Sequence, residues 1–159
     1  MSSTAPILLN SQIIGRAHYA ARALLDRELR RTGITFHQSM ALNAAAGEGG
    51  TADTGRIVEL MTSTLKIDEA TARDTVSELL AAELFEPLEA LEARPDRGPC
   101  VALTEAGRTE QSRLAAVAVE FAPRVYGEIP AEDLAVAGRV LTEVIARANA
   151  VYAETADRY

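Results

Sequence analysis

The sequence predicts a mainly α-helical fold with a small β-hairpin. Apolar residues recur three or four positions apart over most of the 159 residues, which is the period of helices with one buried face. The exception is the region near 86–103, where a turn-forming run, 94–99, separates two short segments that alternate loosely. An apolar share of 48% and a charged share of 25% are ordinary for a globular chain. The fold class is therefore helical, with one hairpin near its middle.

Composition excludes several other classes. Apolar runs are all shorter than the ~18 residues that span a bilayer, so we expect no membrane partner. The first residues lack the basic flank and apolar stretch of a secretory signal, and the lone Cys100 cannot form an internal disulfide. Both observations favour a cytoplasmic protein. The 16 basic and 23 acidic residues give a net charge of −7, which argues mildly against a phosphate-rich partner.

The first half of the chain predicts two helices joined by a short break. Residues 8–31 carry one apolar stripe, which Gly33 interrupts. Thr35 and Gln38 have the spacing of a capping box, so they predict the start of a second helix that ends near Gly47. The stripe of the first helix consists of Ile13, Ile14, Ala17, Ala21, Leu24 and Leu25.

Four further helices and the hairpin complete the prediction. A short helix is expected over 53–64, and Asp68 is a suitable cap for the next, over 68–83. Thr104 should cap a fifth helix, which Pro123 is expected to kink or end. A final helix starts at Pro130, and its apolar residues nearly repeat every seven positions, which is typical of a helix that packs on a second subunit.

This order of elements matches a winged helix-turn-helix, and the chain resembles the MarR (multiple-antibiotic-resistance) family of bacterial regulators. The resemblance extends from about Leu8 to Tyr152. The motifs that carry it are Gly33-Ile34-Thr35-Phe36-His37-Gln38, Val76-Ser77-Glu78-Leu79-Leu80, Pro95-Asp96-Arg97 and Val101-Ala102-Leu103-Thr104-Glu105-Ala106-Gly107.

The resemblance implies a ligand-responsive transcriptional regulator that binds a pseudo-palindromic DNA operator as a homodimer. Residues 1–159 would form a single domain, with a DNA-binding lobe at 35–104 and dimerisation helices at 7–32 and 105–156. Helix 68–83 would enter the major groove, with the wing, 86–103, beside it. The DNA-contact candidates are Lys66, Thr71, Arg73, Asp74, Thr75, Ser77, Arg94 and Arg97, and the candidates to bind a small aromatic or anionic effector are His18, Arg22 and His37.

Three features depart from the family pattern. Residues 65–104 hold four cations and nine carboxylates, a net charge of −5, whereas 7–34 has a net charge of +3. Glu83 stands where the family usually has a glycine, at a position that favours positive φ. The wing tip has Gly98 where an arginine is more frequent. An alternative hypothesis is therefore a dimeric winged-helix module that has lost DNA binding and acts as a small-molecule sensor or protein-interaction module.

Chemistry-bearing motifs are scarce. The sequence has no nucleophile elbow, phosphate loop or metal-ligand spacing, so we expect no catalytic residues, metal or cofactor, and no enzyme. His18 and His37 are equally consistent with packing or surface roles. Cys100 could be a redox sensor or a small apolar residue, and the carboxylates at 68 and 69 could simply favour the helix dipole.

Overall fold

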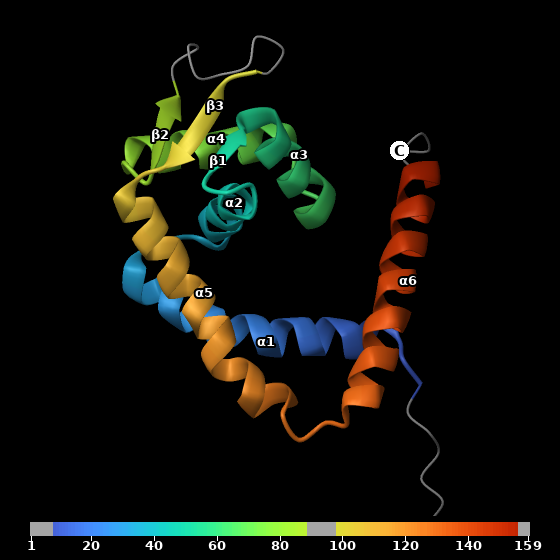
Figure 1. Ribbon diagram of the computed structural model, residues 1–159. Coiled ribbons are helices and arrows are strands. Elements are labelled where there is room, and N and C mark those ends of the chain that lie inside the picture. Colours follow the sequence, from blue (N-terminus) through green and yellow to red (C-terminus); the bar gives the residue numbers. More distant parts are fainter. Residues whose placement is uncertain (1–7, 89–97, 156–159) are drawn as a thin grey trace, which may run out of the picture. The chain divides into compact units, whose positions relative to one another are not determined.

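The computed structural model describes residues 8–88 and 98–155, and the elements of this part follow the predicted order (Figure 1). They are α1 (Ser11–Thr32), α2 (Phe36–Gly47), β1 (Thr51–Asp53), α3 (Thr54–Leu65), α4 (Glu69–Ala81), β2 (Phe85–Leu88), β3 (Cys100–Leu103), α5 (Glu105–Tyr126) and α6 (Ala131–Thr155). The mainly helical fold with a small hairpin is confirmed. None of the described helices is long and apolar enough to cross a bilayer.

The predicted caps set the helix boundaries. The Thr35 hydroxyl accepts from the Gln38 N–H at 3.1 Å, and the Gln38 side chain accepts from the Thr35 N–H at 2.9 Å, which completes the capping box of α2. Asp68 caps α4 by accepting from the Thr71 N–H at 2.8 Å. The Thr104 hydroxyl accepts from the Gly107 N–H at 3.0 Å at the start of α5. Side-chain oxygens therefore satisfy N–H groups that the first helical turn leaves unpaired.

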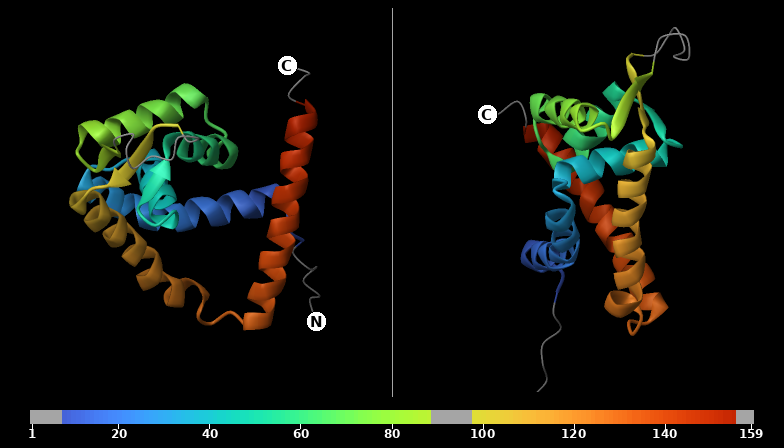
Figure 2. Two further views of the ribbon diagram at one scale, coloured as in Figure 1. Left: turned by 45° about the horizontal axis from the view of Figure 1, so that its top comes forward. Right: turned by 90° about the vertical axis from the view of Figure 1, so that its left-hand side faces the viewer.

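The hairpin belongs to a three-stranded antiparallel sheet of order β1-β3-β2. Phe85 pairs with Leu103 and Leu88 with Cys100, while β1 lies on the other side of β3, with Ala52 opposite Val101. In both views of Figure 2, β3 runs beside β2 and leads into α5. β1 was not predicted, because three residues between a glycine loop and a helix cap are too few to show a strand period.

One core joins α2, α3, α4 and the sheet. Leu42 of α2, Ile57 of α3, Leu79 of α4 and Phe85 of β2 are all almost completely buried. Gly107 of α5 lies so close to the chain after α4 that a Cβ there would come within 2.0 Å of the Leu84 carbonyl oxygen. The sheet and the start of α5 are therefore packed onto the helices that position α4.

Glu83 adopts φ 55°, and Lys66, at the end of α3, adopts φ 57°. The positive φ expected at position 83 is thus confirmed, although the residue there is a glutamate and not a glycine. An L-residue pays for this conformation in steric strain that glycine avoids.

The chain divides into two compact units, 1–118 and 119–159. The boundary lies within α5, which continues past Pro123 to Tyr126, so of the two expectations for Pro123 the end of the helix is wrong and the kink stays a prediction. A proline removes only one N–H donor from the helix, and the Gly127 N–H donates to the Pro123 carbonyl at 2.9 Å where α5 ends. The assignment of a single domain with terminal dimerisation helices stays a prediction.

Candidate nucleic-acid interface

Helices α3 and α4 form a helix-turn-helix. Lys66 ends α3 in the left-handed conformation, Ile67 follows, and Asp68 caps α4. Ala72, Val76 and Leu79 fix the inner face of α4 in the core, so the opposite face is exposed to solvent. The predicted contact residues on and beside α4 can therefore be compared with that exposed face.

Thr71 forms hydrogen bonds with Asp68, the residue that caps α4. Its N–H and its hydroxyl both donate to the Asp68 carboxylate, at 2.8 and 2.9 Å. These hydrogen bonds, the backbone one first, lower the pKa of Asp68 below its ordinary value of 3.8, because they stabilise the ionised form. Thr71 is half-buried, so only part of its side chain is available to a partner.

Arg73 is the cation of α4, and it is already paired. Its Nε and Nη2 both donate to Oε1 of Glu69, at 2.8 and 2.6 Å. The two side chains are 57% and 64% exposed, so solvent weakens the pair and a DNA partner can compete for the guanidinium. Glu69 was expected only to favour the helix dipole, although its i,i+4 spacing from Arg73 also predicts this ion pair.

Thr75 lies outside the exposed face. The residue is only 4% exposed, and its hydroxyl donates to the Thr71 carbonyl at 2.8 Å. A side chain in this position supports the helix and does not reach a base edge, so the prediction of Thr75 as a contact residue is wrong. Ser77 is exposed, with its hydroxyl donating to the Arg73 carbonyl at 3.1 Å, and Asp74 is exposed beside it.

The remaining candidates flank α4. Lys66 is exposed in the turn before the helix. The wing candidates Arg94 and Arg97 lie outside the described residues. The described part of the interface therefore offers two basic side chains, Lys66 and Arg73.

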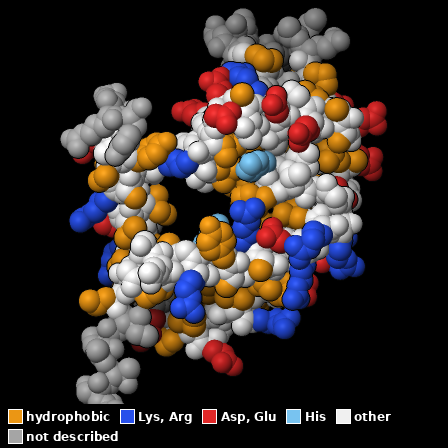
Figure 3. All heavy atoms as spheres, turned by 180° about the vertical axis from the view of Figure 1, so that it is seen from behind, with side chains coloured by type: hydrophobic (Ala, Val, Ile, Leu, Met, Phe, Trp, Pro, Cys, Tyr) orange, Lys and Arg blue, Asp and Glu red, His pale blue; other side chains and the backbone are white. Residues whose placement is uncertain are grey.

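Carboxylates dominate the exposed face of α4. Asp68, Glu69, Asp74 and Glu78 surround the single Arg73. In Figure 3, acidic side chains are scattered over the upper lobe, while several basic ones gather below it, over α1. The charge asymmetry expected from the sequence is thus a feature of the folded surface.

A hydrogen bond ties α4 to the beginning of α2. The Gln38 side chain, which closes the capping box with Thr35, also donates from Nε2 to Oε2 of Glu78 at 2.9 Å. The two residues are 40 positions apart, so no local pattern predicts this contact. It fixes one of the carboxylates of α4 with respect to α2.

The three effector candidates do not form one cluster. Arg22 of α1 holds its guanidinium 4.0 Å above the Phe36 ring, and its Nε lies 3.6 Å from Oδ1 of Asp26. These residues line a hollow of about 280 Å³ together with Leu29, Arg30, Gly33 and Ile34. His18 is exposed and packs edge-on against Tyr19, and half-buried His37 lies beside Phe36. Of the three candidates, only Arg22 lines this hollow.

The geometry gives no support to the hypothesis that Cys100 is a redox sensor. Cys100 is buried, and its Sγ lies 3.5 Å from the Gly98 carbonyl oxygen, as expected for a small side chain packed in a sheet. Within residues 8–88 and 98–155, no three histidine, cysteine or acidic side chains come together as metal ligands.

Solved structures share this fold. A MarR family transcriptional regulator from Silicibacter pomeroyi is 16% identical, with 84% of each chain covered and a TM-score of 0.66. NadR in complex with 4-hydroxyphenylacetate is 17% identical, with 91% of this chain and 98% of that chain covered and a TM-score of 0.66. BpsR from Bordetella bronchiseptica, whose DNA binding is regulated by 6-hydroxynicotinic acid, is 19% identical, with 84% and 96% covered and a TM-score of 0.63.

No protein-family model and no curated protein matches the sequence. The likeness to these structures therefore concerns the fold, and there it confirms the resemblance found in the sequence.

Proposed function

We propose that this chain, which has the fold of MarR family regulators, is a homodimeric transcriptional regulator that binds a pseudo-palindromic operator. The observation that carries the proposal is the exposed face of α4, which presents Arg73 and Ser77 on a helix held firmly by its inner face. Within this arrangement Arg73 would read a guanine, and Lys66 would contact a phosphate. In a two-fold dimer the half-sites would lie about 34 Å apart.

Dimer formation is supported by the unit 119–159. None of the residues of α6 is buried in the single chain, although Val136, Val140, Val144 and Ile145 are among them. A helix with so many exposed apolar side chains gains free energy by packing against another surface. Sedimentation at micromolar concentration should give the mass of two chains, and the mass of one chain would remove this part of the proposal.

Arg22 and Phe36 support an effector that is a small aromatic acid. Two compounds of this class act on proteins with the same fold: NadR forms a complex with 4-hydroxyphenylacetate, and 6-hydroxynicotinic acid regulates DNA binding by BpsR. In this chain, a carboxylate could replace Asp26 as the partner of Arg22, whose Nε makes no hydrogen bond in the described structure. Adding 4-hydroxyphenylacetate should then change the affinity for DNA, and Arg22→Gln should abolish the change without altering affinity in its absence.

Selection from a random-sequence duplex library at low salt tests the central proposal. A two-fold motif should be enriched, and its affinity should fall steeply as salt rises, because binding releases counterions from phosphates. No enrichment at low salt, with and without 4-hydroxyphenylacetate, would contradict DNA binding.

The acidic face of α4 favours a second candidate function, a dimeric sensor or protein-interaction module without DNA binding. Four carboxylates surround Arg73 there, and each would repel a phosphate backbone. The two functions predict opposite results in the library selection. Enrichment of a motif would exclude the module, and its absence would favour it.

A further inference from the structure

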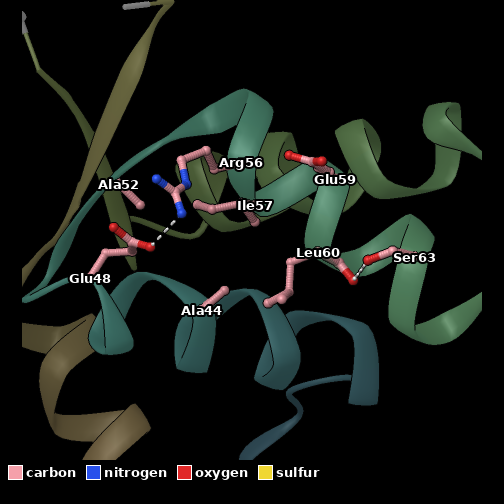
Figure 4. Close-up of a pocket in the computed structure, with 8 residues that line it drawn as sticks. All are labelled: Ala44, Glu48, Ala52, Arg56, Ile57, Glu59, Leu60 and Ser63. Atoms are coloured by element: carbon pink, nitrogen blue, oxygen red, sulfur yellow. Dashed lines mark hydrogen bonds and ion pairs between the residues drawn. The ribbon is translucent and has the colours of Figure 1, made fainter. Parts of the chain in front are cut away.

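Both helices of the helix-turn-helix are tied to α2. Arg56 of α3 forms an ion pair with Glu48, the residue that follows α2, with Nη2 3.4 Å from Oε1 (Figure 4). The hydrogen bond from Gln38 to Glu78 links α4 to the other end of α2. Together with the buried side of α4, these contacts fix the direction in which its exposed face points.

Four exposed residues lie opposite the buried side of α4. The buried residues are Ala72, Thr75, Val76 and Leu79. Because an α-helix turns by about 100° per residue, the residues on the far side are Ala70, Asp74, Ser77 and Ala81, all of them exposed. We call these four residues the outer line. Arg73 lies at one edge of it, so the polar side chains at the middle of the exposed face are those of Asp74 and Ser77.

Ser77 presents only a hydrogen-bond acceptor to a partner. A serine hydroxyl has one proton and two lone pairs, and the proton of Ser77 is donated to the Arg73 carbonyl at 3.1 Å. The oxygen remains available on the outer side of the helix. In this arrangement a base edge opposite Ser77 must supply the N–H group.

Asp74 also presents only acceptors, and its charge is not neutralised. Within residues 8–88 and 98–155 it forms no hydrogen bond or ion pair, and its neighbour Arg73 donates to Glu69 instead. An ionised carboxylate has lone pairs but no proton to donate. The side chains of the outer line therefore offer hydrogen-bond acceptors and no donor.

One base edge in the major groove matches this pattern. Cytosine presents its N4 amino group and no acceptor. Adenine presents N7 beside its N6 amino group, guanine presents N7 and O6, and thymine presents O4 and a methyl group. An acceptor on a base repels a carboxylate, so a carboxylate on the outer line favours cytosine over the other three bases.

We propose that Asp74 determines a cytosine in each half-site of the operator, by accepting a hydrogen bond from the N4 amino group. Ser77, on the same line, accepts from the amino group of a neighbouring base. This role of Asp74 rests on the proposed function, since α4 must lie in the major groove for its outer line to meet a base. It makes an acidic side chain of α4 a determinant of sequence specificity.

A carboxylate that only repelled phosphates would behave differently. Its removal would raise the affinity for every duplex by the same factor, whereas loss of a base contact changes the preference at one position. Replacing Asp74 by asparagine separates these two roles, because the side chain keeps its length and its amide forms two hydrogen bonds with N6 and N7 of adenine.

Selection from a random-sequence duplex library at low salt, with the wild type and its variants, tests this role. The wild type should select cytosine at one position of each half-site. Asp74→Asn should select adenine there and leave the rest of the motif unchanged. Asp133→Asn removes an equal charge from an exposed position on α6 and should select the wild-type motif.

Fluorescence anisotropy with the cytosine duplex and the adenine duplex measures the size of the switch. The wild type should bind the cytosine duplex about fivefold more tightly, and Asp74→Asn should reverse this order. Asp74→Ala should bind the two duplexes with similar affinity, because it can contact neither base.

The outcomes distinguish this role from the proposed function. A wild-type motif in which neither Asp74 variant changes a base preference would overturn the role of Asp74 and leave the proposed function intact. An equal rise in affinity for both duplexes in both variants would also overturn it, and would show that the carboxylate only repels phosphates. The absence of any motif with the wild type would contradict the proposed function and this role together.

Discussion

Replacing Arg73 by alanine removes the one cation of α4 and so tests whether this helix reads DNA. In the free protein Arg73 is bound to Glu69 through two short hydrogen bonds, at 2.8 and 2.6 Å. Since both side chains are more than half exposed, the pair is worth about 0.3–0.5 kcal/mol. Releasing the guanidinium for a guanine therefore costs little, about twofold in affinity.

A bidentate contact between arginine and guanine is worth about 1–3 kcal/mol of discrimination. Arg73→Ala should thus weaken binding to the selected operator by about fivefold to 150-fold for each half-site. It should also relax the base preference at one position. Fluorescence anisotropy with the operator and with a duplex altered at that position measures both effects.

Glu69→Gln is the matched variant, because it keeps the arginine and removes the carboxylate that holds it. We expect operator affinity to rise about twofold or more, since one repulsive charge also leaves the face of α4. A salt titration separates the possible roles of Arg73. Loss of a phosphate contact lowers the slope of log affinity against log salt by about 0.9, with no change in base preference. Unchanged affinity and unchanged preference in Arg73→Ala would refute the assignment altogether.

Three further predictions concern stability. Glu83→Gly should raise the free energy of unfolding in urea by about 1 kcal/mol, because glycine adopts the φ of 55° without strain, whereas Glu86→Gly in β2 should lower it. Gly107→Ala should cost about 3 kcal/mol in the same assay, since its Cβ would meet the Leu84 carbonyl oxygen at 2.0 Å; a loss below about 0.5 kcal/mol would show that the backbone gives way. Because the pKa of Asp68 is lower in the folded chain than its unfolded value of 3.8, ionised Asp68 stabilises the fold above that pH, and this stability is lost as pH falls through the folded value. The difference in unfolding free energy between the wild type and Asp68→Asn should therefore shrink below about pH 4. A difference that stays constant with pH would contradict this cause.

Local signals predicted most of the fold. Thr35, Asp68 and Thr104 mark helix starts because a cap is a contact between near neighbours, which the sequence displays directly. β1 escaped prediction because its existence depends on pairing with β3, about 50 residues away, and not on its own three residues. Pro123 does not end α5, because the loss of one hydrogen bond leaves those of the neighbouring residues in place.

The candidate interface was predicted less completely than the fold. Thr75 was chosen as a contact residue, yet its spacing from Ala72, Val76 and Leu79 puts it on the buried stripe, so helical period alone could have excluded it. The pairing of Arg73 with Glu69 was also readable from its spacing. The link from Gln38 to Glu78 and the meeting of Arg22 with Phe36 were not, because both join elements that only the tertiary fold brings together.

The Gln38 side chain makes hydrogen bonds to two helices, as an acceptor in α2 and as a donor to α4. Its oxygen must accept from the Thr35 N–H to begin α2, and its nitrogen must donate to Glu78 on α4. A glutamate at this position could accept from the Thr35 N–H but would repel Glu78, while an aliphatic side chain could form neither hydrogen bond. Substitutions at this surface position would therefore alter helix stability and the charge geometry of α4 at once, and a screen for either property would report on both.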